Sequence, residues 1–146
     1  MSHWVRVRNN GLRLAAHTGA MSDVVELFAF LHDTQRQNEH HDPEHGRCAA
    51  DFSRKLRGKL FKLDDEGLKL LCLACTGHSD GHMEADITTQ TCWDADRLDL
   101  GRVVIIPNPA RLCTAAAHNA TMIKWACQTF PNIRFTSVSS RINLVS

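Results

Sequence analysis

The spacing of apolar residues, which follows a helical period through most of the 146 residues, constrains the fold more than any other feature. Helices are predicted over residues 3–16, 22–31, 46–60, 64–78, 89–100 and 109–130, the last with a break near residues 118–119. Polar loops are predicted over residues 34–46 and 79–88, and an irregular tail over residues 130–146. The pattern therefore predicts a compact all-α bundle of about six helices.

Length and composition are typical of one globular domain, here residues 1–146. The hydrophobic fraction is 43% and the charged fraction is 23%, which argues against disorder. No apolar run approaches the roughly 20 residues of a membrane-spanning helix, and no secretion signal is recognisable, so we expect a cytoplasmic protein with no membrane partner. A net charge of +1 does not favour nucleic-acid binding.

The six cysteines are predicted to be free thiols rather than a disulfide framework. Cys72 and Cys75 have the CxxC spacing of a redox or half-zinc motif, but no second CxxC pair completes a four-sulfur site. Small and apolar neighbours surround most of them, which predicts buried structural thiols at Cys72, Cys75, Cys92, Cys113 and Cys127.

The histidines and a group of aspartates are the best candidates for chemistry. His32 closes one predicted helix, His45 begins the next, and His78 closes the one after that. A later helix carries three acidic residues, Asp94, Asp96 and Asp99, beside apolar ones. Buried carboxylates are costly unless they are paired or bound to metal. Imidazole and carboxylate ligands suit Mn, Fe, Co, Ni or Zn, and Mg is a further option through the carboxylates.

Four of these residues carry a family resemblance. His3, the doublet His32–Asp33, and Asp96 resemble, in order, the H…HD…D signature of the HD-domain superfamily of metal-dependent phosphohydrolases. The likeness extends over about residues 2–105 and includes the segments Ser-His-Trp-Val-Arg-Val, Phe-Leu-His-Asp and Ala-Asp-Arg-Leu-Asp-Leu-Gly. The resemblance implies an HD-type bundle in which these four residues bind a divalent metal ion. Asp94 is the alternative to Asp96 as the fourth ligand.

The resemblance also implies further ligands and substrate contacts. His45, His78 and Asp94 are candidates for a second metal ion or for the substrate phosphate. Arg36 is expected to hold that phosphate, because a guanidinium pairs with two phosphate oxygens.

Three more residues have expected catalytic roles. Arg97 is a second candidate to hold the phosphate, with an ion pair to Asp94 or Asp99 as its alternative role. Glu44 is a candidate general base, provided that its loop folds over the site. Asp33 is expected to bind metal and to orient the attacking water.

The function implied by the resemblance is hydrolysis of a small phosphorylated molecule, such as a nucleotide, by metal-activated water. Two alternatives stay open: a diiron oxygenase of the HD type, and a non-catalytic HD module that binds a ligand or a protein partner. The oligomeric state is also open, because apolar residues in the tail could dock on the same chain or on a second copy in a homodimer.

Overall fold

The computed structural model describes residues 2–37, 42–99 and 106–128, and in these segments the chain is helical, as predicted. The elements are α1 (His3–Thr18), α2 (Ser22–Leu31), α3 (His45–Leu56), α4 (Asp65–Gly77), α5 (Ile87–Arg97), the short 3-10 helix η2 (Pro109–Arg111), α6 (Ala115–His118) and α7 (Ala120–Gln128). None of these helices has the length and apolar character needed to cross a membrane. The predicted tail over residues 130–146 lies outside the described residues.

Two of the differences from the predicted helices have local reasons. The helix α3 ends at Leu56 rather than near residue 60, because Arg57 leaves the helical conformation and Gly58 adopts a left-handed φ of 84°. The single helix predicted over residues 109–130 is divided into η2, α6 and α7. The predicted break near residues 118–119 is confirmed, since Asn119 has extended backbone geometry.

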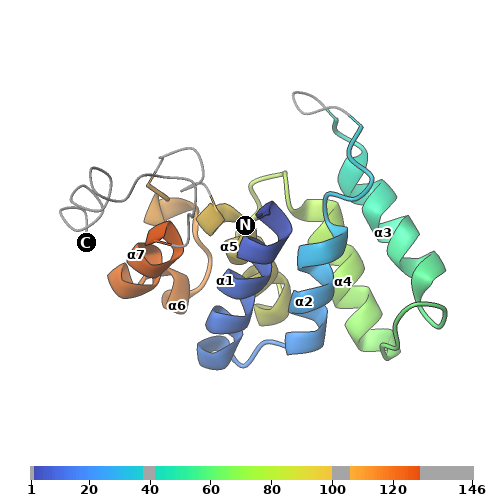
Figure 1. Cartoon of the computed structure of the whole chain (residues 1–146), viewed down its shortest axis with the longest axis horizontal. Coiled ribbons are helices and arrows are strands. Elements are labelled where there is room, and N and C mark those ends of the chain that lie inside the picture. The colour runs from blue at the N-terminus through green and yellow to red at the C-terminus, as the bar shows by residue number, and fades with distance from the viewer. Residues whose placement is uncertain (1, 38–41, 100–105, 129–146) are drawn as a thin grey trace.

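The helices form a bundle (Figure 1), and their buried side chains make two apolar cores. The larger core is made by α1 to α5, with α1 packed on α2 and α5, and α3 packed on α4. The smaller core joins α6 and α7 to α1 and to the end of α5; it contains Leu14, Leu98, Leu112, Ala117, Met122 and Ala126. Helix α1 contributes Val7 and Ala15 to the larger core and Leu14 to the smaller one, so both cores fix its position.

Helix direction brings distant parts of the sequence together. The first four helices alternate in direction, so the starts of α1 and α3 lie at the same end of the bundle as the ends of α2 and α4 (Figure 1). The last turn of α5 reaches the same end, where Asp99 contacts His3. Residues that are far apart in the chain therefore meet at one end of the bundle, and side chains from facing helices are how bundles assemble metal sites.

Two glycines allow the close helix contacts that this arrangement requires. A Cβ atom on Gly11 would lie 2.4 Å from Val25 Cγ1, at the contact between α1 and α2. A Cβ atom on Gly46 would lie 2.4 Å from the carbonyl oxygen of Cys75, at the contact between α3 and α4. Because Gly46 follows His45 and Cys75 precedes His78 by one turn, this second approach sets the distance between the two histidines.

Candidate metal centre

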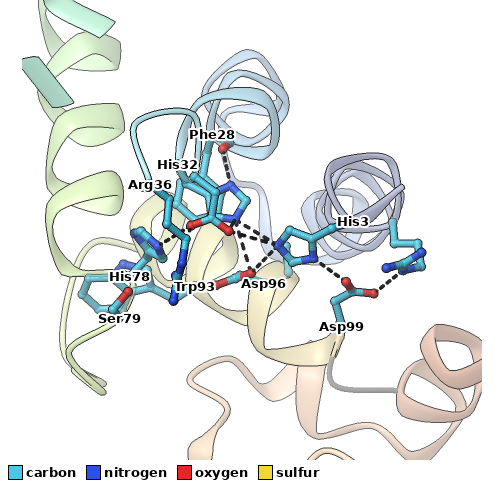
Figure 2. Close-up of polar contacts among 12 residues, drawn as sticks. His3, Phe28, His32, Arg36, His78, Ser79, Trp93, Asp96 and Asp99 are labelled. Carbon is cyan, nitrogen blue, oxygen red and sulfur yellow. Dashed lines mark hydrogen bonds and ion pairs between the residues drawn. The ribbon is translucent and has the colours of Figure 1, made fainter. Parts of the chain in front are cut away.

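The residues with the H…HD…D order meet in one cluster, in which Figure 2 shows His3, His32 and Asp96, and Asp33 contacts both histidines. His3 comes from the first turn of α1, the doublet His32–Asp33 directly follows α2, and Asp96 is in the last turn of α5. His3 Nε2 lies 3.2 Å from His32 Nε2, 3.2 Å from Asp96 Oδ1 and 3.5 Å from Asp33 Oδ2. His32 Nε2 lies 3.4 Å from each of the two carboxylate oxygens.

These separations suit a metal ion. The Nε2 atoms of His3 and His32 and the Oδ1 atom of Asp96 lie 3.2 to 3.4 Å from one another, so an ion between them could be about 2.1 Å from each. This is the usual length of metal bonds to imidazole nitrogen and carboxylate oxygen. Two neutral imidazoles and two carboxylates also supply the charge that a divalent cation needs. We name this group the first ligand set: His3, His32, Asp33 and Asp96.

The other ring nitrogen of each histidine in this set is already bound. His32 Nδ1 lies 2.9 Å from the carbonyl oxygen of Phe28, to which it must donate its proton. His3 Nδ1 lies 2.5 Å from Asp99 Oδ2. Such partners fix the ring orientation and leave the Nε2 lone pair for a metal ion, as is usual for histidine ligands.

His45 and His78 form a second ligand set with Asp33. The Nε2 atoms of the two histidines are 2.9 Å apart, and each is 3.3 Å from Asp33 Oδ1. Their Nδ1 atoms donate to backbone carbonyls, that of His45 to Asp42 at 2.5 Å and that of His78 to Cys75 at 2.7 Å. Both histidines therefore also direct a lone pair towards the cluster.

Asp33 connects the two ligand sets. Its Oδ2 atom faces His3 and His32, whereas its Oδ1 atom faces His45 and His78. A carboxylate that offers one oxygen to each of two nitrogen-rich sets is suited to bridge two cations, as in sites that bind paired metal ions. The described residues that could hold a metal ion come from both sets and include His3, His32, Asp33, His78 and Asp96.

Burial and close contacts shift the proton affinities of this cluster. Burial lowers the pKa of His3, but hydrogen bonds with Asp33, Asp96 and Asp99 outweigh burial and raise this pKa to about 11. Burial raises the pKa of Asp33, yet its hydrogen bonds with His3 and His78 hold that pKa below its usual range. The charge of His32 and hydrogen bonds with His3 and His32 outweigh burial at Asp96 and lower its pKa in the same way. Both carboxylates therefore stay ionised at neutral pH.

Of the two arginines expected to hold phosphate, only Arg36 has its guanidinium at the cluster. Its Nη1 atom lies 3.4 Å from His45 Nε2 and 3.8 Å from Asp33 Oδ1. Arg97 instead donates to the carbonyl oxygens of His82 at 2.7 Å and Arg111 at 3.0 Å. The guanidinium of Arg97 therefore binds two loops and is not brought to the ligand sets.

Two carboxylates expected at the site lie elsewhere. Glu44 is exposed and pairs with Arg47 at 2.7 Å, so the expected general base does not reach the ligand sets. Asp94 accepts hydrogen bonds from the backbone N–H groups of Cys113 at 2.6 Å and Thr114 at 2.8 Å, and from the Thr114 hydroxyl at 2.8 Å. Asp94 therefore anchors a loop, and it is Asp96 that joins the first ligand set.

Asp99 is a functional candidate to which the sequence assigned no specific role at the site. Besides binding His3, its carboxylate accepts a hydrogen bond from Arg6 Nε at 2.7 Å, and both side chains are buried. A carboxylate behind a histidine ligand makes the ring a stronger electron donor. The sequence signal for Asp99 is its place in the acidic segment that includes Asp94 and Asp96. That signal does not distinguish a carboxylate that binds metal from one that hydrogen-bonds to a histidine ligand.

A cavity of about 560 Å³ opens beside the ligand sets and contacts His3, His78 and Asp96. Its volume is in the range of pockets that bind small molecules. The centre is therefore accessible from one side to a substrate-sized compound.

No family model, curated protein or solved structure matches this chain. What the centre does is therefore inferred from its own geometry and chemistry.

Replacement of Asp99 by Asn should weaken metal binding about 10- to 100-fold, since His3 loses its anionic partner while the ligand set itself is intact. Calorimetric titration with Mn²⁺ measures this change, and circular dichroism checks the helical content. Asp51→Asn, an exposed carboxylate paired with Arg54, is the control. Equal affinity in Asp99→Asn and the wild type would contradict the supporting role.

Metal binding should release at least one proton at pH 8, because the pKa of His3 is raised to about 11, the pKa of His32 is also raised, and each ring must lose its Nε2 proton to become a ligand. Affinity should therefore increase as the pH rises from 6.5 to 8.5. Calorimetry in two buffers with different ionisation enthalpies gives the number of protons released. An affinity that does not depend on pH, with no proton release, would show that His3 is not a ligand.

Proposed function

We propose that the chain is a metal-dependent phosphohydrolase that removes phosphate from a small phosphorylated molecule. The observation that carries this proposal is the position of Asp33, whose two carboxylate oxygens face two separate histidine pairs. The order of His3, His32–Asp33 and Asp96, which resembles the HD-domain signature, supports the same reaction class.

The residues at the centre have distinct roles in this proposal. The first ligand set would hold one divalent ion, and His45, His78 and the other oxygen of Asp33 would hold a second. Ions bound there would supply Lewis acidity and lower the pKa of a water molecule. Hydrolysis forms a P–O bond to water and breaks the ester P–O bond, and the leaving oxygen takes up a proton.

Arg36 is proposed to bind the phosphoryl group. Its guanidinium is about one-third exposed and lies beside the Asp33 oxygen that faces His45 and His78. A phosphoryl oxygen at that position would accept a charge-assisted hydrogen bond from Nη1. Arg36 therefore neutralises the charge that develops on the phosphoryl oxygens during hydrolysis.

We further propose a cytoplasmic location. All six cysteines are free thiols: Cys72, Cys75, Cys92 and Cys127 are buried, Cys113 is partly buried, and Cys48 is exposed. Cysteines that remain unpaired fit a reducing compartment.

A diiron oxygenase is the second candidate, favoured by the second ligand set of His45, His78 and Asp33. Two iron ions on four imidazoles and a shared carboxylate are a redox-capable arrangement. Iron retained after aerobic purification, together with an optical band from the iron pair and no phosphatase activity, would favour the oxygenase.

Replacement of Asp33 by Ala should abolish Mn²⁺-dependent hydrolysis of phosphomonoesters, because both ligand sets lose an oxygen at once. Phosphate release from a panel of phosphomonoesters measures the activity, and circular dichroism should show unchanged helical content. The control is Asp51→Ala, which removes an exposed carboxylate from α3. Activity in Asp33→Ala equal to that of the control would overturn the proposed centre.

A further inference from the structure

The cavity beside the ligand sets has two walls that belong to loops. One wall is the segment after α4, which includes Ser79, Gly81 and Met83. The other wall is η2 and its neighbours, which include Asn108, Arg111 and Leu112. The first wall directly follows the ligand His78, whereas the second wall is distant in sequence from all four ligand histidines, so the cavity needs its own explanation.

Residues of α5 hold both walls in place. Arg97 donates to the carbonyl oxygen of His82 in the first wall and to that of Arg111 in the second. Its guanidinium also lies over the Trp93 ring, 5.5 Å from the ring centroid, and Trp93 Nε1 donates to the carbonyl oxygen of Ala74 in α4. Asp94 fixes the residues that follow the second wall by its bonds to Cys113 and Thr114. The cavity is therefore a built feature, because buried or charge-assisted bonds define both of its sides.

Charge is distributed unevenly along the cavity. The end at the ligand sets carries His3 and two carboxylates, Asp96 and Asp99, each of which contacts His3. Arg97 lines the cavity but uses its guanidinium on the loop carbonyls. Arg111 is the other arginine of the lining, and it is exposed. Within the described part of the chain, its backbone has hydrogen-bond partners but its guanidinium has none. Apolar lining residues, among them Met83 and Leu112, complete the walls.

We propose that this cavity binds the organic part of the substrate and that Arg111 binds a second acidic group on it. This inference rests on the proposed phosphohydrolase function, in which the reacting phosphate lies at the ligand sets. The substrate class is then a phosphomonoester that carries a carboxylate or a further phosphate at its far end. The guanidinium of Arg111 has no partner among the described residues, and a guanidinium can pair with such a group through two parallel hydrogen bonds.

Arg97 is a positioning residue in this proposal. It touches neither the phosphate nor the second acidic group, but it sets the distance between the two loops and so the place of Arg111. A lysine could not replace it, because one guanidinium bonds to two carbonyls and lies over an aromatic ring at the same time.

The test compares a monoacid with a diacid on the Mn²⁺-loaded protein. The monoacid is phenylphosphonate, and the two diacids are 4-carboxyphenylphosphonate and its longer 4-carboxymethyl homologue. Calorimetry gives the affinity for each compound. None of the three can be hydrolysed as a phosphate ester. The wild type should bind at least one diacid about tenfold more tightly than the monoacid, and Arg111→Gln should reduce that ratio to about one. Lys55→Gln, which removes an exposed cation of α3, should keep the wild-type ratio.

The two proposals fail in different ways. A wild-type ratio near one for both diacids, or a ratio that Arg111→Gln leaves unchanged, would overturn the Arg111 subsite even if phenyl phosphate is hydrolysed. A preference for diacid that depends on Arg111, without hydrolysis of phenyl phosphate or 4-carboxyphenyl phosphate, would support the subsite and overturn the phosphohydrolase function.

Discussion

The carboxylate of Asp33 contacts histidines from three other helices, and the end of the bundle is organised around these contacts. Each of the four imidazoles around this carboxylate also has a second partner, and such partners fix the ring orientation. His32, His45 and His78 find that partner in a backbone carbonyl, and His3 finds it in Asp99. The centre therefore depends on main-chain positions as much as on side chains.

The apolar cores supply the precision that these contacts need. Helix α1 lies between two cores, which keeps His3 opposite the end of α5. The approach of Gly46 to the carbonyl of Cys75 brings α3 against α4 at the level of their histidines. Packing at this density transmits small shifts, so substitutions away from the centre would still move the ligand atoms.

Much of the fold and part of the centre could be predicted from the sequence. The helical period identifies the bundle, and the order of His3, His32–Asp33 and Asp96 names residues that do meet. The roles of Asp94 and Glu44 could not be predicted, because a carboxylate that binds backbone N–H groups or a surface arginine has the same local sequence pattern as a ligand. The hydrogen bond between Asp99 and His3 depends on the tertiary contact between α1 and the end of α5. No periodic pattern in the sequence predicts such a contact.

Metal content per chain tests the central claim most directly. After saturation with Mn²⁺ or Fe²⁺ and removal of free ions, elemental analysis of the wild type should give about two ions per chain. His45→Ala should retain about one ion, because it leaves the first ligand set intact, and His17→Ala, on the exposed face of α1, should retain both. The absence of bound metal in the wild type, or the same count in His45→Ala as in the wild type, would contradict a centre built on a shared Asp33.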